Sequence, residues 1–202
     1  MTPPSRIVVL ISGNGTNLQA LIDGCEDGTI SGKIVAVVSN RRRAFGLTRA
    51  ERAGISQQVV PYAPFKGQED GREAYDAALA DRVAGLEPDL VVLAGWMRIL
   101  TGRFLRRFPS QVINLHPALP GAFPGLDAIE RAWSAAQRGE LDHTGIMVHE
   151  VIEEVDAGPV LGTATVPIDP GMNLADLEAA IHRAEHRLLV EVVAERCLTR
   201  QR

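Results

Sequence analysis

Residues 7–17 read Ile-Val-Val-Leu-Ile-Ser-Gly-Asn-Gly-Thr-Asn, and this stretch decides the fold. Its consecutive apolar residues, mostly β-branched, are typical of a short strand that is buried on both faces of a sheet. The two glycines that follow predict a tight turn, and Asn17 is a possible cap for a helix that begins there. A strand, a glycine turn and a helix form the opening unit of a parallel α/β protein.

The same alternation continues through the first 115 residues of the chain. Further strands are expected at Ile34–Val38, Gln58–Val60, Leu90–Ala94 and Val112–Leu115, and helices at Asn17–Cys25, Ala44–Ala53, Arg72–Ala84 and Ile99–Arg107. Strands joined in this way need right-handed crossovers. We therefore expect an α/β fold with a doubly wound, mostly parallel, Rossmann-like sheet.

The pattern changes after Pro117. Residues 118–126 contain prolines and glycines but no charges, which is typical of an ordered loop. Beyond it we expect a helix at Ile129–Arg138, strands at Gly145–Ile152 and Val160–Pro167, and a long helix at Leu174–Cys197. The later strands are expected to extend the same sheet, some of them antiparallel. No repeat or Ser/Gly-rich linker divides the sequence, so residues 1–202 are expected to form a single domain.

Composition and charge argue against several classes of protein. The chain has 202 residues, 46% of them apolar, and a formal net charge of -4, which gives no electrostatic footprint for nucleic acid. Cys25 and Cys197 lie far apart and outside any CxxC pattern, so neither a zinc ribbon nor a disulfide framework is indicated. The apolar run Ile7–Ile11 is too short for a signal sequence or a membrane span. We expect a cytoplasmic protein without membrane or nucleic-acid partners.

The turn at residues 12–17 lies where backbone N–H groups and a helix dipole favour a phosphate. Leu18 occupies the place of the third glycine of a dinucleotide fingerprint, so the GxGxxG pattern is incomplete. Arg41-Arg42-Arg43 follow Ser39-Asn40 and are suited to an NADP 2′-phosphate. An NADP-dependent oxidoreductase is therefore one alternative, and a tight turn without any ligand is another.

Asn114 and His116 follow each other closely at the end of an expected strand. Residues two apart on a strand point to the same side, so both are expected at the carboxyl edge of the sheet, where ligands bind. A histidine transfers protons near neutral pH, and an asparagine amide donates to a developing oxyanion. Asp156, in the turn Asp156-Ala157-Gly158-Pro159, is the candidate partner of His116. A role only in shaping that turn is the alternative.

Several motifs, taken in order, resemble a known family. They are Ile-Ser-Gly-Asn-Gly-Thr-Asn-Leu at 11–18, Ser39-Asn40 with Ala44-Phe45-Gly46-Leu47, Val-Leu-Ala-Gly-Trp-Met-Arg-Ile-Leu at 92–100, Asn114-Leu115-His116-Pro117 and Asp156-Ala157-Gly158-Pro159. Together they resemble the phosphoribosylglycinamide formyltransferases of purine synthesis, from about residue 6 to about residue 190. The resemblance implies transfer of a formyl group from 10-formyltetrahydrofolate, as co-substrate, to the amine of glycinamide ribonucleotide.

The resemblance also implies roles for individual residues. Asn114, His116 and Asp156 match the family's catalytic residues. The residues that match its substrate-binding site are the phosphate loop Gly13, Asn14, Gly15, Thr16 and Asn17, and the acidic Glu185. Those that match its folate site are Arg72, Met97, Arg98, Ile99, Leu100 and Asn114. On this interpretation, about residues 1–110 bind the nucleotide phosphate, about residues 111–202 carry the folate and catalytic functions, and no metal is required.

The implied reaction agrees with the chemistry of these side chains. When the amine attacks the formyl carbon, the oxyanion takes hydrogen bonds from Asn114 and a protonated His116. Asp156 beside His116 favours the charged imidazolium. The proton reaches the folate nitrogen through His116 or through an ordered water, and both routes stay open. No covalent intermediate is required, which fits the lack of a placed Cys or Ser nucleophile.

Two features depart from the resemblance or compete with it. Ala118 stands where the family usually has serine, and Pro120 comes one position early, so the conformation of the 118–126 loop is not predicted. Residues 182–186 read His-Arg-Ala-Glu-His and fit HxxEH, which makes a zinc peptidase a third hypothesis. Related enzymes acting on methionyl-tRNA carry a nucleic-acid-binding domain that 202 residues do not accommodate. Small-molecule substrates, and a monomer or homodimer, are therefore expected.

Overall fold

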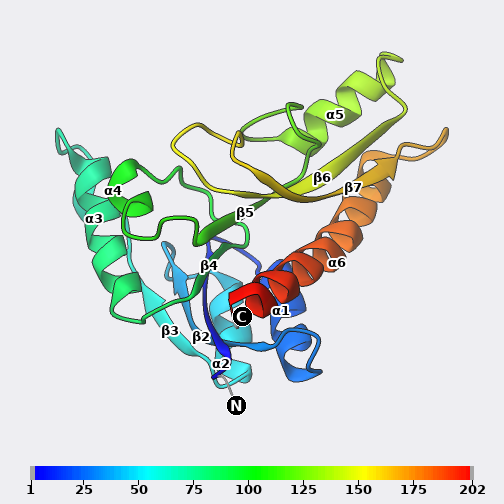
Figure 1. Cartoon of the computed structure of the whole chain (residues 1–202). Coiled ribbons are helices and arrows are strands. Elements are labelled where there is room, and N and C mark those ends of the chain that lie inside the picture. The colour runs from blue at the N-terminus through cyan, green and yellow to red at the C-terminus, as the bar shows by residue number, and fades with distance from the viewer. Residues whose placement is uncertain (1–2, 201–202) are drawn as a thin grey trace.

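The structure of the chain is a computed structural model that describes residues 3–200. Its centre is a seven-stranded sheet with the order β3-β2-β1-β4-β5-β6-β7 (Figure 1). The strands are β1 (Ser5–Ile11), β2 (Gly32–Ser39), β3 (Ser56–Val59), β4 (Leu90–Leu93), β5 (Val112–His116), β6 (His143–Glu150) and β7 (Val160–Pro167). The helices are α1 (Thr16–Glu26), α2 (Phe45–Arg52), α3 (Gly71–Ala84), α4 (Gly102–Leu105), α5 (Ala128–Gln137) and α6 (Leu174–Arg200), with a 3₁₀ turn η1 (Ala63–Phe65).

Strand direction divides the sheet into two parts. The pairs β3·β2, β2·β1, β1·β4 and β4·β5 are parallel, whereas β5·β6 and β6·β7 are antiparallel. The chain winds outward from β1 in both directions, and such sheets bind ligands outside the carboxyl ends of their central strands. The expected doubly wound, mostly parallel sheet with antiparallel strands in its C-terminal part is confirmed.

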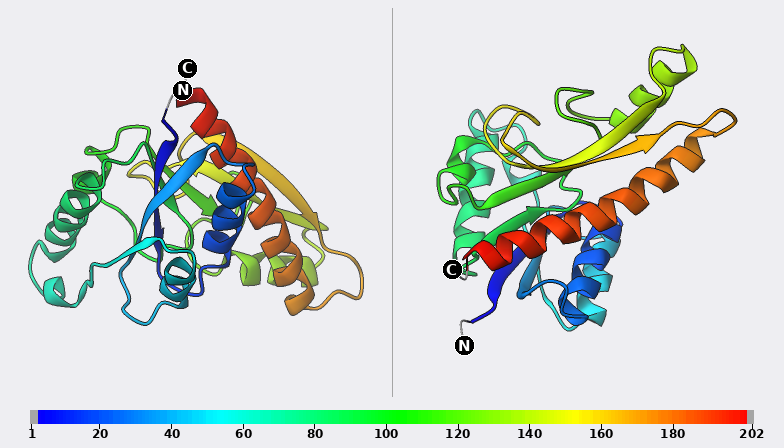
Figure 2. Two further views of the ribbon diagram at one scale, coloured as in Figure 1. Left: turned by 90° about the horizontal axis from the view of Figure 1, so that it is seen from below. Right: turned by 45° about the vertical axis from the view of Figure 1, so that its right-hand side comes forward.

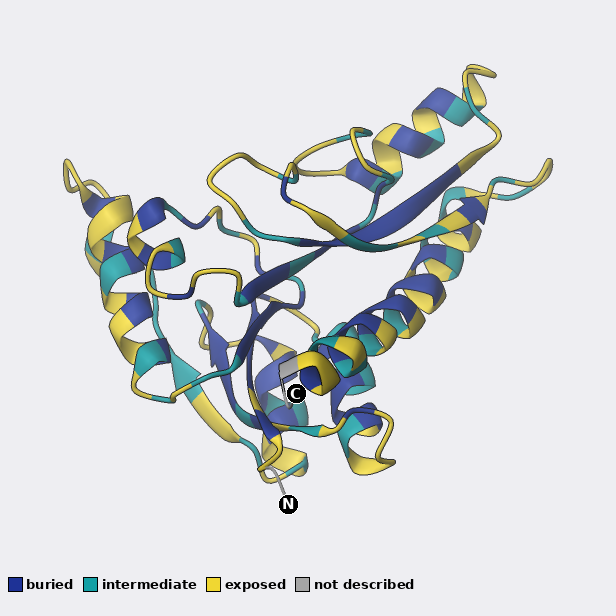
Figure 3. Ribbon diagram, in the orientation of Figure 1, coloured by how far each residue is buried: buried dark blue, intermediate teal, exposed yellow. Residues whose placement is uncertain are grey.

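Helices cover both faces of the parallel part of the sheet (Figure 2). Ile7, Val9 and Ile11 pack in a core with α1, α2 and α6, whereas Val8 and Leu10 pack in a second core with α3 and α4. Because successive residues of a strand point to opposite faces, a strand between two helical layers must be apolar throughout. The central strands are accordingly buried along most of their length (Figure 3).

The prediction of a helix over Ile99–Arg107 is wrong in length, because α4 spans only Gly102–Leu105. Thr101 is its N-cap, and the Thr101 hydroxyl accepts a hydrogen bond from the Arg103 N–H at 3.3 Å. The Thr101 N–H donates to the carboxylate of buried Asp76 in α3 at 2.6 Å. This long-range contact fixes where the helix begins and leaves residues 97–100 in a non-helical segment.

The capping role expected for Asn17 is also wrong. Gly15 is the N-cap of α1, with a φ of 76° that favours glycine, and it can provide no side-chain cap. Asn17 lies one residue inside the helix, and its amide donates to Glu185 of α6 at 3.4 Å. The first N–H groups of α1 are therefore left without a side-chain acceptor.

The long helix α6 runs from the antiparallel edge of the sheet back to the beginning of β1 (Figure 1). The hydroxyl of Ser5, the first residue of β1, donates to the carbonyl of Cys197 near the end of α6, at 3.3 Å. The beginning of β1 and the last turns of α6 consequently lie close together (Figure 2). No helix within residues 3–200 combines the length and the apolar character needed to cross a membrane.

Candidate active site

Three segments that are distant in sequence meet at the carboxyl end of β5. Asn114 and His116 lie two residues apart at the end of this strand, with parallel β4 on one side and antiparallel β6 on the other. Asp156 comes from the connection between β6 and β7, where it adopts a φ of 53° that few non-glycine residues take. The change of strand direction at β5 therefore brings the β6–β7 connection over the end of a parallel strand.

The three predicted catalytic side chains contact one another. His116 Nδ1 lies 3.4 Å from Asp156 Oδ2, and Asn114 Nδ2 donates to Asp156 Oδ1 at 3.4 Å. His116 Nε2 lies 3.1 Å from the carbonyl oxygen of Phe123. The Gly125 N–H donates to Asp156 Oδ2 at 2.9 Å. The side chains of His116 and Asp156 are only 5% and 10% exposed, so they interact in surroundings of low polarity.

His149 is a member of this cluster that the sequence analysis left without a partner. It pairs directly with Asn114 across β5 and β6, and its side chain is 2% exposed. His149 Nδ1 lies 2.8 Å from the Glu150 carbonyl, and Nε2 lies 3.2 Å from Asn114 Nδ2 and 3.5 Å from Asp156 Oδ1. In the sequence, His149 directly follows the apolar residues Ile146, Met147 and Val148 of the expected strand Gly145–Ile152.

The pKa values of the central pair are shifted in a consistent pattern. Burial opposes ionisation of Asp156, but hydrogen bonds from His149 and from the Gly125 N–H, together with the charge of His116, lower the pKa of its carboxyl. Burial lowers the pKa of His116, and the nearby Asp156 carboxylate offsets this only in part. At neutral pH the pair is therefore an ionised carboxylate beside a neutral imidazole.

The pKa of His116 is lowered, whereas Asp156 was expected to favour the charged form of this ring. Both of its ring nitrogens face oxygen acceptors, Asp156 Oδ2 and the Phe123 carbonyl, which is the hydrogen-bonding pattern of an imidazolium. Desolvation outweighs this pattern in the resting state. The surroundings thus keep the ring neutral at rest and supply partners for the cation that forms when it takes up a proton.

A cavity of about 600 Å³ opens beside these residues. Its lining includes the three catalytic candidates and all the folate-site candidates, namely Arg72, Met97, Arg98, Ile99, Leu100, Asn114, His116 and Asp156. Met97, Ile99 and Leu126 are large apolar residues that are more than half exposed and line the cavity. The structure therefore brings together two groups of residues that the sequence analysis named separately.

Two arginines give one end of the cavity a positive charge. Arg98 lies with its guanidinium 3.5 Å from the ring centre of Tyr62 and 5.3 Å from that of Tyr75, so aromatic faces support the cation. Arg72 donates to the Ile99 carbonyl at 3.3 Å. Arg98 belongs to the segment that follows β4, and Arg72 of α3 bonds to that segment, so both arginines line the same part of the cavity.

The glycine loop lies next to the cavity but outside its lining. Ser12 connects the two, because its N–H donates to the Gly95 carbonyl at 3.0 Å and its hydroxyl accepts from the Met97 N–H at 2.9 Å. Gly15 packs so closely on Gly46 of α2 that an added Cβ would lie 2.7 Å from the Gly46 Cα. The glycine loop is therefore held against α2 and against the segment that follows β4.

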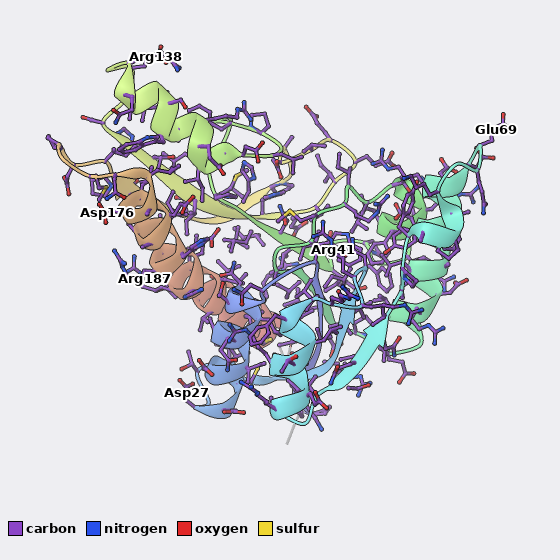
Figure 4. The ribbon with its side chains drawn as sticks, turned by 180° about the vertical axis from the view of Figure 1, so that it is seen from behind. Asp27, Arg41, Glu69, Arg138, Asp176 and Arg187 are labelled. Carbon is purple, nitrogen blue, oxygen red and sulfur yellow. The ribbon has the colours of Figure 1, made fainter. Side chains whose placement is uncertain are left out.

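Arg49 of α2 also fixes this loop. Its guanidinium donates to the Asn14 carbonyl at 3.0 Å, to the Asn14 side-chain oxygen at 3.0 Å and to Gln19 at 3.3 Å. Arg41 to Arg43, the candidate NADP contacts, are exposed beyond the end of β2 (Figure 4). Ser39 bonds to the backbone of Arg41, so this segment forms a local turn rather than a phosphate cradle.

Glu185 is buried on α6 and faces the glycine loop. It accepts hydrogen bonds from Asn17 at 3.4 Å and from His182 Nδ1 at 2.8 Å, and the bond to Glu185 raises the pKa of His182. His186 has no hydrogen-bond partner for its Nε2. Among the described residues, no group of three or more His, Cys, Asp or Glu side chains is arranged to hold a metal. The HxxEH match is thus a local helix contact, and the zinc-peptidase hypothesis is not supported.

Comparisons with known proteins agree with one another. The formyl transferase family model matches residues 5–193. Phosphoribosylglycinamide formyltransferase of Schizosaccharomyces pombe is 48% identical over 94% of this chain and 95% of its own length, and that of Escherichia coli is 42% identical over 94% and 85%. The crystal structure of glycinamide ribonucleotide transformylase 1 from Symbiobacterium toebii matches with a TM-score of 0.87 and 42% identity, over 96% of this chain and 88% of that one. The oxidoreductase alternative finds no support here, and the chain belongs to the formyl transferase family.

Proposed function

We propose that this enzyme transfers a formyl group from 10-formyltetrahydrofolate to the amine of glycinamide ribonucleotide, a step of purine biosynthesis, and does so at the end of β5. The observation that carries this proposal is the convergence of Asn114, His116 and Asp156 at the mouth of one cavity. The names of the family relatives, which cover most of the chain, support the same activity.

The cavity suits a reduced folate by shape and charge. Its volume of about 600 Å³ and its apolar walls match a ring system with apolar faces and polar edges. Met97, Ile99 and Leu100 contact that ring system, while Arg72 and Arg98 bind the anionic end of the molecule. Asn114 reaches the formyl group from the end of β5. This assignment places the co-substrate against the segment that follows β4.

The glycine loop binds the phosphate of the nucleotide substrate. Residues 13–17 lead into α1, whose first N–H groups have no side-chain cap and whose dipole favours an anion. The Glu185 carboxylate, oriented by Asn17 and His182, accepts hydrogen bonds from the sugar hydroxyl groups. Ser12 links this loop to the cavity wall at Met97, so the amine of the bound nucleotide is directed toward His116.

Each step of the transfer has a candidate group. The amine nitrogen attacks the formyl carbon, and the Asn114 amide donates to the oxyanion that develops on the formyl oxygen. Neutral His116 takes up the proton released from the amine, and ionised Asp156 stabilises the imidazolium. The imidazolium then protonates the departing folate nitrogen as the tetrahedral intermediate collapses, and this returns His116 to its neutral form.

Cellular location and domain organisation are also part of this proposal. The enzyme acts in the cytoplasm on small-molecule substrates, as a single functional domain over residues 1–202. In the proposed division of functions, residues 1–110 contain the phosphate loop and residues 111–202 contain the catalytic residues. The folate cavity nevertheless takes its lining from both parts, with Arg72 and Met97–Leu100 on one side of the boundary.

A direct assay tests the activity. Purified enzyme is supplied with glycinamide ribonucleotide and 10-formyltetrahydrofolate, and both the formylated nucleotide and the released tetrahydrofolate are quantified. We expect equal amounts of the two products. A parallel assay follows NADPH oxidation with the same protein. Oxidation of NADPH without formyl transfer would reject the proposed function.

A further inference from the structure

The loop between β5 and α5 contacts the reacting pair through its backbone alone. The Phe123 carbonyl accepts from His116 Nε2 at 3.1 Å, and the Gly125 N–H donates to Asp156 Oδ2 at 2.9 Å. One loop therefore supplies an acceptor to the imidazole and a donor to the carboxylate. Small displacements of this loop change the orientation of both groups together.

Two non-glycine residues at the end of this loop adopt strained backbone conformations. Phe123 and Asp127 have φ values of 46° and 55°, which cost free energy in residues that carry a Cβ. The backbone bonds within residues 118–126 include that from the Ala122 N–H to the Leu119 carbonyl, which spans the first part of the loop. A contact from another element is needed to keep Phe123 and Gly125 against His116 and Asp156.

Arg131 of α5 provides that contact. Its Nη1 donates to the Pro124 carbonyl at 2.7 Å and lies 3.5 Å from the Leu126 carbonyl oxygen. Its guanidinium lies 5.5 Å from the centre of the Phe123 ring. These contacts reach both sides of Gly125, so a single side chain holds the segment 123–126.

We propose that Arg131 is a positioning residue, which holds residues 123–126 so that the Phe123 carbonyl and the Gly125 N–H orient His116 and Asp156. The inference rests on the proposed function of the site. Arginine suits this role because a planar guanidinium presents several donors and an aromatic-stacking face at once, whereas lysine offers a point charge. Arg131 contacts the loop and leaves the substrate to other residues.

The pKa of His116 provides a second test of the positioning role of Arg131. The groups that face His116 are Asp156 from the β6–β7 connection, His149 from β6 and Arg131 from α5. Burial lowers the pKa of His116, the Asp156 carboxylate and the hydrogen bond to the Phe123 carbonyl raise it, and the charges of His149 and Arg131 lower it further. Release of the loop removes the hydrogen bond to Phe123 and therefore lowers the pKa at which His116 titrates, whereas loss of the Arg131 charge with the loop still in place would raise it.

Two variants and one control test the inference. Arg131→Met removes the donors and the charge but keeps most of the stem, and Arg131→Lys keeps the charge. The control, Arg138→Met, removes a cation from just beyond the other end of α5, where Arg138 is paired with Glu140 (Figure 4). Unfolding midpoints and circular dichroism establish that each variant is folded.

We expect Arg131→Met to lower kcat by about 10- to 100-fold, as small misplacements of catalytic groups do, with the KM for glycinamide ribonucleotide changed less than about twofold. Arg131→Lys is expected to lower kcat as well, because a point charge does not reproduce the contacts of the guanidinium on both sides of Gly125. Arg138→Met is expected to match the wild type. The NMR titration of the His116 ring should move to lower pH in Arg131→Met, a result that does not depend on activity.

Distinct outcomes separate this inference from the proposed function. An unchanged kcat and an unchanged His116 titration in Arg131→Met, with an active wild type, would overturn the positioning role alone. An equal loss of kcat in Arg138→Met would overturn it too, because the effect would then be general. Absence of formyl transfer in the wild type would overturn the proposed function, while the His116 titration would still report on the loop.

Discussion

The glycine loop and the loop after His116 lie at the same edge of the sheet, yet they are held in different ways. Residues 13–17 are fixed by close backbone packing on Gly46 and by Arg49, and Gly15 alone carries a positive φ there. Residues 118–127 contain non-glycine residues at positive φ and reach the catalytic pair through single hydrogen bonds. Steric fit and several hydrogen bonds from one arginine hold the first loop, whereas the second combines strained backbone with single hydrogen bonds to the catalytic pair.

This difference matches the tasks proposed for the two loops. A phosphate has the same charge and shape throughout the reaction, so a rigid cradle suffices to bind it. The groups around His116 must accommodate a proton that arrives and departs, so they need partners for both charge states. Changes in the glycine loop should therefore affect stability and KM, whereas changes near His116 should affect kcat.

The largest effect is expected at the catalytic pair. His116→Ala removes the proton acceptor and should lower kcat by about 100-fold or more, with little change in nucleotide affinity. Asp156→Asn should cause a similar loss, because the imidazolium loses its charge partner. Steady-state kinetics with both substrates, together with equilibrium binding of the nucleotide, measure the two quantities. An undiminished kcat in either variant would remove that residue from the mechanism.

A substitution in the glycine loop should change stability first. Gly15→Ala places a Cβ 2.7 Å from the Gly46 Cα at a φ of 76°, and we expect a loss of about 1–3 kcal/mol in unfolding free energy with a raised nucleotide KM. Gly13→Ala is the matched control, since nothing lies within 4 Å of its added Cβ. Urea denaturation and KM values compare the two. Equal stabilities would mean that the loop is not held by steric fit.

Acidification should destabilise the catalytic end of the molecule. The folded-state pKa values of His116 and Asp156 both lie below their ordinary values, so the unfolded chain binds protons first as the pH falls. The His116 contribution is lost from about pH 6.5 downward, and the Asp156 contribution only at lower pH, as its carboxyl protonates. Thermal unfolding of the wild type and of His116→Gln, measured against pH, checks this. The decline that begins near pH 6.5 should be smaller in the variant, where His186, whose pKa is also lowered by burial, still contributes to it, and identical curves would contradict the assignment.

The smallest effect is expected where the glycine loop is joined to the cavity wall. Ser12→Ala removes the acceptor of the Met97 N–H and should lower the unfolding free energy by about 1 kcal/mol. Because Ser12 connects the phosphate loop to the cavity wall, the KM values for both substrates should rise slightly while kcat stays near that of the wild type. A selective fall in kcat would show that the two regions are less separate than their contacts indicate.

Much of the architecture was predictable because buried parallel strands leave a strong local signal. The apolar run Ile7–Ile11 is buried on both faces, and the spacing of Asn114 and His116 was sufficient to place them on one side of β5. The short α4 was not predictable, since its start depends on the contact between Thr101 and Asp76. Local propensity cannot report a partner that lies in another helix.

The site residues that were not predicted also depend on contacts between distant parts of the chain. His149 joins the cluster through the antiparallel register of β5 and β6, which pairs residues 35 positions apart. Arg131 acts on carbonyl groups of a loop whose proline spacing departs from the family pattern. Asn17 was mistaken for a cap because the left-handed conformation of Gly15 places the start of α1 earlier. Pairwise geometry of this kind appears only in the folded chain.

The hydrogen bond between Ser5 and Cys197 makes the path of the chain almost a closed ring. Ser5 and Cys197 meet at the amino edge of the sheet, whereas the cavity lies at the carboxyl edge. Linking the ends and opening the chain at an exposed surface turn would yield a circular permutant with the same core. The fold is in this sense suited to serve as a module within a longer polypeptide.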